Sequence, residues 1–74
     1  MSPETYFKKN GKIYGVSSKY NFGWSHYVVV FDDFQCAQKW LHTEEYDFRE
    51  RELMSRTVAI NLAGREVVDN AECG

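Results

Sequence analysis

The sequence is poor in the residues that mark several special protein classes. One proline and five glycines among 74 residues are too few for a linker or a low-complexity tract. Two cysteines, Cys36 and Cys73, cannot build the disulfide framework of a small secreted domain, so we expect reduced thiols, with Cys36 in the core. No apolar run approaches the roughly 20 residues of a membrane-spanning helix. Residues 1–4 lack signal-peptide features, so we expect a cytoplasmic protein with no membrane partner.

Motifs for catalysis and for metal or cofactor binding are also missing. Neither C-x-x-C nor H-x-x-x-H occurs, and Cys36 with His42 is the only close pair of zinc-type ligands. The glycines form neither a phosphate loop nor a dinucleotide fingerprint. The paired acids at 32–33 and 44–45 are explained by helix capping or solvation. We also expect a chain of this size not to wall off a pocket of about 300 Å³. The sequence predicts a non-enzyme with no metal and no cofactor.

What is present indicates a single small folded domain over residues 1–74. The chain is 43% hydrophobic and 16% aromatic, which argues against intrinsic disorder. The net charge of −2 is divided unevenly: residues 1–27 sum to +3 and residues 28–74 to −5. Attraction of the whole molecule to nucleic acid is therefore expected to be weak, although the first part carries a local basic region.

Turn chemistry and alternation predict three strands. The Asn10–Gly11 pair suits a two-residue hairpin turn, which predicts a hairpin over residues 5–16 with Phe7 opposite Tyr14. A third strand is predicted over residues 25–31. Successive residues of this strand point to opposite faces, and both faces carry apolar side chains, which is typical of a strand covered on two sides.

Helical spacing predicts two helices after the strands. The first, over residues 33–41, begins at the Asp32–Asp33 pair and places Phe34, Ala37, Trp40 and Leu41 on one face. The second is a long helix over residues 48–72, with a kink or break at Gly64. A short strand at 57–63 is the rival interpretation. The expected fold is α+β: a three-stranded antiparallel sheet in β-β-β-α-α order, packed by a short helix and a long C-terminal helix.

The segment over residues 20–27 is unusually rich in rings. Tyr20, Phe22, Trp24 and His26 occupy alternate positions and would share one face of an extended chain. One interpretation is a wall of the core, with Trp24 and Tyr27 buried. The other is a contact surface, because interfaces favour Trp, Tyr and Phe. The sequence leaves both interpretations open.

Without a catalytic motif, the favoured function is a small protein-binding module that acts on another protein as an adaptor or inhibitor. The alternative is single-stranded nucleic-acid binding, with bases stacked on the rings and phosphates held by lysines. A third option is a homodimer through a face formed by Leu53, Ile60 and Val67. The expected binding residues are Tyr20, Phe22, Trp24, Lys12, Lys19 and His26.

Overall fold

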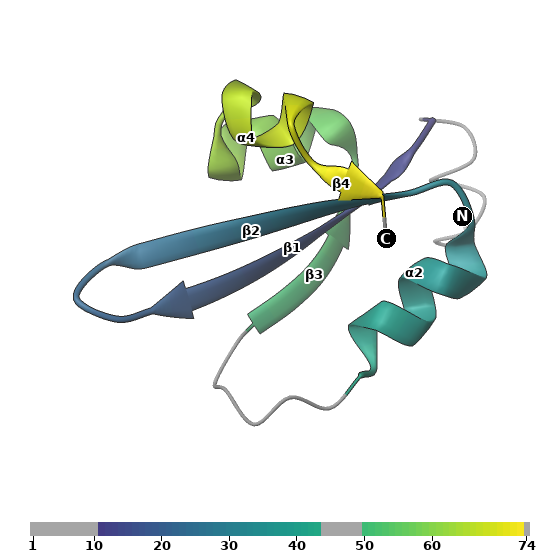
Figure 1. Cartoon of the computed structure of the whole chain (residues 1–74), viewed down its shortest axis with the longest axis horizontal. Helices are drawn as coiled ribbons and strands as arrows, with labels where there is room; N and C mark the ends of the chain where they lie inside the picture. The colour runs from purple at the N-terminus through teal and green to yellow at the C-terminus, as the bar shows by residue number, and fades with distance from the viewer. Residues whose placement is uncertain (1–10, 44–49, 74) are drawn as a thin grey trace.

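The computed structural model describes residues 11–43 and 50–73, which form four strands and three helices (Figure 1). Their order along the chain is β1 (Ile13–Tyr20), β2 (Trp24–Phe31), α2 (Phe34–Leu41), β3 (Glu50–Met54), α3 (Arg56–Ala63), α4 (Arg65–Asp69) and β4 (Glu72–Cys73). Strands β1 and β2 are the longest and form a hairpin whose turn extends beyond the helices.

The four strands form one mixed sheet in the order β3-β1-β2-β4. Strand β1 pairs antiparallel with β2, from Ile13 opposite Phe31 to Tyr20 opposite Trp24. It also pairs antiparallel with β3, whereas the two-residue strand β4 runs parallel to β2. The prediction of a three-stranded antiparallel sheet in β-β-β-α-α order is therefore wrong.

The predicted hairpin over residues 5–16 is not the hairpin of this sheet. Residues 5–10 lie outside the described residues. Tyr14 has Val30 on one side and Met54 on the other, so β1 has no free edge for the predicted Phe7–Tyr14 pair. The true partners are later segments of the chain. The predicted strand at 25–31 is found as β2. Its alternation onto two buried faces is confirmed for residues 28–31, whereas residues 25–27 are exposed or half-buried.

The helix predicted over 33–41 is present as α2, where the Asp33 carboxylate accepts a hydrogen bond from the Gln35 amide at 2.8 Å. The long helix predicted over 48–72 is wrong, because this region contains β3, α3, α4 and β4. The rival strand at 57–63 is also wrong, since α3 occupies it. The predicted break at Gly64 is confirmed: its φ of 97° is non-helical and separates α3 from α4.

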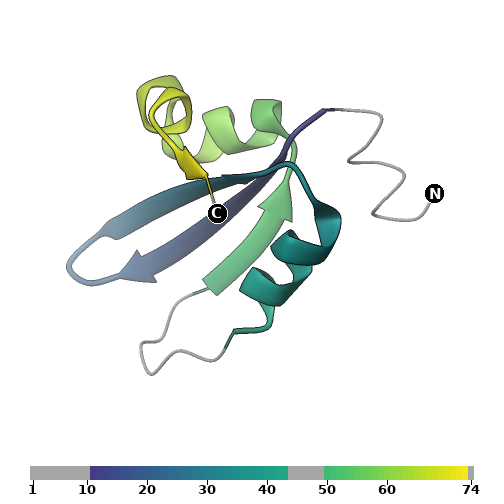
Figure 2. The ribbon, with the colours of Figure 1, turned by 45° about the vertical axis from the view of Figure 1, so that its right-hand side comes forward.

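Helices cover the sheet on both faces (Figure 2). On one face, α3 and α4 pack on a cluster that consists of Tyr14, Val16, Val28, Val30, Met54, Ala59 and Val68. On the other face, α2 packs on a cluster that consists of Ile13, Val29, Phe31 and Ala37, with Phe34, Trp40 and Leu53 at its margin. Both clusters lie near one end of the hairpin, so the turn end is left outside the core.

Candidate functional site

The turn between β1 and β2 places an aromatic side chain in an unfavourable backbone conformation. The turn consists of residues 21–23, and the Asn21 amide donates to the Gly23 carbonyl at 2.9 Å. Phe22 has a φ of 60°, and no other described residue except glycine has a positive φ. This left-handed region suits glycine, asparagine or aspartate and is an outlier for a bulky residue. Local backbone preference therefore does not explain why phenylalanine occupies this turn.

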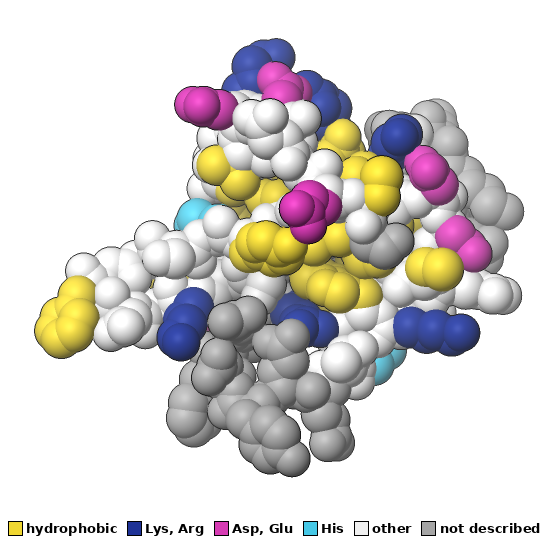
Figure 3. Space-filling view, in the orientation of Figure 1, with side chains coloured by type: hydrophobic (Ala, Val, Ile, Leu, Met, Phe, Trp, Pro, Cys, Tyr) yellow, Lys and Arg dark blue, Asp and Glu magenta, His cyan; other side chains and the backbone are white. Residues whose placement is uncertain are grey.

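The rings at the turn end are exposed rather than packed. The exposed fractions are 66% for Tyr20, 103% for Phe22 and 57% for Trp24. Figure 3 shows hydrophobic surface at the far end of the projecting hairpin, set apart from the apolar surface near the helices. Tyr27, on the opposite face of β2, is 55% exposed. Of the two interpretations that the sequence left open, the core wall with Trp24 and Tyr27 buried is therefore wrong.

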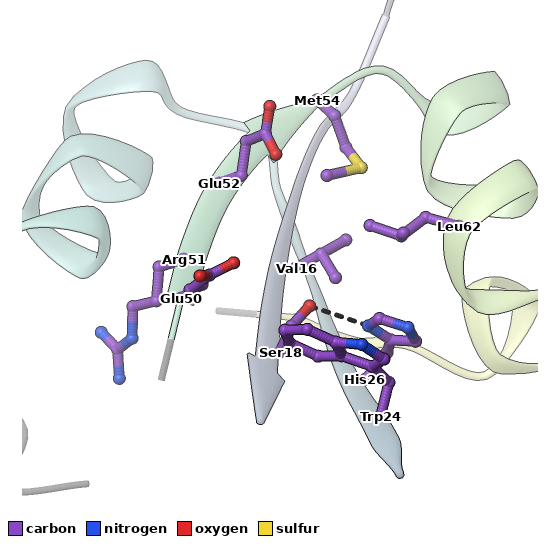
Figure 4. Close-up of a pocket in the computed structure, with 9 residues that line it drawn as sticks. All are labelled: Val16, Ser18, Trp24, His26, Glu50, Arg51, Glu52, Met54 and Leu62. Carbon is purple, nitrogen blue, oxygen red and sulfur yellow. Dashed lines mark hydrogen bonds between the residues drawn. The ribbon is translucent and has the colours of Figure 1, made fainter. Parts of the chain in front are cut away.

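A groove of about 430 Å³ begins beside these rings and runs toward α3 (Figure 4). It lies on the sheet face that α3 and α4 cover only in part. Its lining residues come from β1, β2, β3 and α3, and they are Val16, Ser18, Trp24, His26, Glu50, Arg51, Glu52, Met54 and Leu62. The groove exceeds the volume of about 300 Å³ that the chain was expected not to wall off, because four elements share the lining, but it is open to solvent rather than walled off.

Ring contacts and one hydrogen bond order the hairpin side of the groove. The Ser18 hydroxyl lies 2.7 Å from His26 Nδ1, across the β1–β2 pair. The indole of Trp24 is parallel to the His26 ring with centroids 6.4 Å apart, and it meets Tyr20 edge-on at 5.5 Å. These contacts hold the Trp24 ring in a defined position although more than half of it is exposed.

The opposite side of the groove is acidic. Glu52 is opposite Val16 and Glu50 is opposite Ser18 in the β1–β3 register, so both carboxylates belong to the groove face. Arg51, between them, points to the other face of the sheet (Figure 4). There it donates to the Trp40 carbonyl and lies 4.7 Å from the centre of the Trp40 ring.

Glu50 and Glu52 were not predicted as site residues, because residues 48–72 were assigned to a helix and the strand at Glu50–Met54 was missed. The alternation of Glu50, Glu52 and Met54 against Arg51 and Leu53 was the available signal. Over only five residues, this alternation is easily mistaken for helical spacing.

Neither of the two predicted binding lysines shares the groove face with Tyr20 and Trp24. Lys12 lies at the opposite end of β1 from the turn, with its Nζ 3.4 Å from an Asp32 carboxylate oxygen. Lys19 alternates with Tyr20 and therefore belongs to the other face of the sheet. Of the six predicted binding residues, the structure brings together Tyr20, Trp24 and His26 on one face, with Phe22 at the adjacent turn.

The predicted dimer face does not exist as one surface. Leu53 packs beside α2 on one side of the sheet, whereas Ile60 packs on the cluster beneath α3 and α4. Val67, on α4, is 42% exposed. The 3.6-residue period that grouped these residues belonged to a helix that does not form.

Cys36 and Cys73 are free thiols and both are exposed, so the expectation of a core position for Cys36 is wrong. Among residues 11–43 and 50–73, no group of three or more His, Cys, Asp or Glu side chains is arranged to hold a metal ion. None of the helices described here has the length and apolar character needed to cross a bilayer.

Comparison with known proteins identifies no relative: no protein-family model, no curated protein and no solved structure matches this chain.

Proposed function

We propose that this chain is a non-catalytic protein-binding module that engages another protein through the end of its β1–β2 hairpin, as an adaptor or inhibitor. The proposal is supported mainly by the exposure and the backbone conformation of Phe22. This ring is fully exposed and its backbone is left-handed, so it contributes neither packing nor turn stability. A bulky ring kept at such a position is well explained by contact with a partner.

The neighbouring rings support a protein partner. Tyr20 and Trp24 are paired across the hairpin next to Phe22 and offer large, rigid contact area at low entropic cost. Two carboxylates, rather than lysines, share the face of these rings. This charge distribution gives less support to the nucleic-acid alternative, because phosphates would meet Glu50 and Glu52. We place the module in the cytoplasm, since exposed free thiols suit a reducing compartment.

A site-specific photocrosslinker tests the proposal. Benzoylphenylalanine replaces Phe22 in one sample and Val67, an exposed residue of α4, in the control. After irradiation in a lysate of the source cells, we expect a discrete protein adduct from position 22 and none from position 67. Excess unmodified domain should compete for the adduct, and the Trp24→Ala domain should compete poorly.

Two outcomes would reject the proposal. The first is the absence of a competed protein adduct at position 22. The second is a nuclease-sensitive adduct together with salt-dependent quenching of tryptophan fluorescence by single-stranded RNA or DNA. That combination would instead establish nucleic-acid binding.

A further inference from the structure

The groove beside the hairpin combines three surfaces that together suit one kind of side chain. Val16, Met54 and Leu62 provide an apolar part near α3. The Trp24 indole provides an exposed aromatic face at the turn end. The carboxylates of Glu50 and Glu52 provide negative charge along β3. In an arginine, the aliphatic stem suits the apolar part, the planar guanidinium suits the aromatic face, and its positive charge suits the carboxylates.

No ion pair among residues 11–43 and 50–73 neutralises the acidic charges in the groove. Glu50 and Glu52 form no ion pair with any residue of the described part of the chain. The guanidinium of Arg51 is engaged with Trp40 on the opposite face of the sheet. The groove therefore presents two carboxylates to whatever enters it.

On its other face, the protein already contains one guanidinium that lies over an indole ring. There the Arg51 guanidinium lies 4.7 Å from the centre of the Trp40 ring. Trp24 has no such cation among residues 11–43 and 50–73, although its ring is exposed and held by Tyr20 and His26. A guanidinium on Trp24 would gain both cation–π attraction and carboxylate contacts in a partly desolvated groove.

We propose that the groove receives an arginine side chain from the protein partner, with its guanidinium stacked on Trp24 and hydrogen-bonded to Glu50 or Glu52. This inference rests on the proposed function and specifies the partner as a protein with an exposed basic segment. Arginine is preferred to lysine, because a planar fork can stack and bond to a carboxylate at the same time.

The test uses the whole chain labelled with ¹⁵N and a short glycine–serine peptide that carries one arginine. Matched peptides carry lysine or citrulline, which is the neutral isostere of arginine, at the same position. The arginine peptide should shift the indole N–H signal of Trp24 in a saturable manner and leave that of Trp40 unchanged. The lysine peptide should bind more weakly, and the citrulline peptide should not bind measurably.

Charge-neutralising variants identify the acidic contact. Glu50→Gln together with Glu52→Gln should weaken binding of the arginine peptide by roughly tenfold or more. Glu66→Gln, with the same type of charge change on α4 outside the groove lining, should change it less than about twofold, because exposed distant charges are screened. Dispersed amide signals in each variant show that the fold is retained.

Several results would overturn the inference. Equal binding of the citrulline peptide would show that charge is not recognised, and an equal effect of Glu66→Gln would show only long-range attraction. A shift of Trp40 instead of Trp24 would locate the site elsewhere. If position 22 crosslinks a protein partner but the arginine peptide leaves Trp24 unchanged, the inference fails and the proposed function stands. If position 22 gives no competed adduct, the proposed function fails whatever the peptide does.

Discussion

The indole of Trp40 lies against the backbone of Gly15, so closely that no side chain fits between them. A Cβ atom at Gly15 would come within 2.6 Å of Trp40 Cζ3 and 2.9 Å of Cη2. The indole is also 5.7 Å from the Phe31 ring, centroid to centroid, and carries Arg51 on its face. The ring is thus held from several directions, and the missing side chain of Gly15 lets α2 approach the sheet.

This contact predicts the effect of Gly15→Ala. We expect a loss of about 2 kcal/mol in the free energy of unfolding, because the added methyl group overpacks a ring that cannot move freely. Trp40→Phe shortens the ring system, so Gly15→Ala should cost less than about 1 kcal/mol in that background. Urea unfolding followed by circular dichroism measures both costs. An equal cost in the two backgrounds would show that the Trp40 ring is not the obstacle.

We expect substitutions of Phe22 to affect the free energy of unfolding and partner binding in different ways. Phe22→Asn should raise the free energy of unfolding by about 1 kcal/mol, because asparagine tolerates the left-handed conformation that strains phenylalanine. Phe22→Ala removes the ring without relieving the backbone and should leave stability nearly unchanged. Both variants should lose partner binding, measured by competition for the crosslinked adduct. Equal stability of the two variants would argue against strain at this turn.

The small side chain of Ala59 allows α3 to pack closely on the sheet. Its side chain is 0% exposed within the cluster that also contains Val16 and Val28. Ala59→Leu should destabilise the protein by about 2 kcal/mol through overpacking. Val58→Leu, at the adjacent and 47% exposed position, should have little effect. Thermal unfolding of the two variants compares them, and similar melting temperatures would contradict the packing described here.

Arg56 connects α3 to α4 and to the sheet. Its guanidinium donates to the Asp69 carboxylate and, at 3.3 Å, to the Tyr14 hydroxyl. The hydrogen bond with Asp69, followed by that with Tyr14, raises the pKa of Arg56 above its already high value. Since a raised pKa favours the charged form, the contribution of this group is lost only at strongly alkaline pH.

This connection predicts local loosening of α4. Asp69→Asn should speed hydrogen exchange of the amides of Val68 and Asn70, which donate within α4 and its cap, relative to amides of the β1–β2 pair. For the unsubstituted protein, protection of α4 corrected for intrinsic exchange should not change between neutral and moderately alkaline pH. Unchanged exchange in Asp69→Asn would show that helix packing alone holds α4.

The features that the sequence predicted correctly depend on neighbouring residues. Alternation over 25–31 places Val28 and Val30 on one face of β2 and Val29 and Phe31 on the other, as observed. The predicted Asp32–Asp33 pair supplies the N-cap of α2, at Asp33, and Gly64 interrupts the helical segment. Capping and alternation act over a few residues, so these elements are determined locally.

The features that the sequence did not reveal depend on distant partners. Glu50–Met54 becomes a strand because the edge of β1, more than 30 residues earlier, is available for pairing. The Asn21–Gly23 segment, rather than Asn10–Gly11, forms the turn of the hairpin in the sheet. Local turn chemistry favours Asn10–Gly11 over a turn that places Phe22 in the left-handed region, so the contacts within the sheet, rather than turn propensity, select the observed turn.

For the candidate site, the sequence by itself determined which rings are concentrated in one segment and that they alternate. Only the tertiary structure decided that Trp24 is exposed, that the lysines do not share its face of the sheet, and that Glu50 and Glu52 do. The physical reason is that exposure and charge neighbours depend on strand pairing and helix placement, which join segments far apart in the chain.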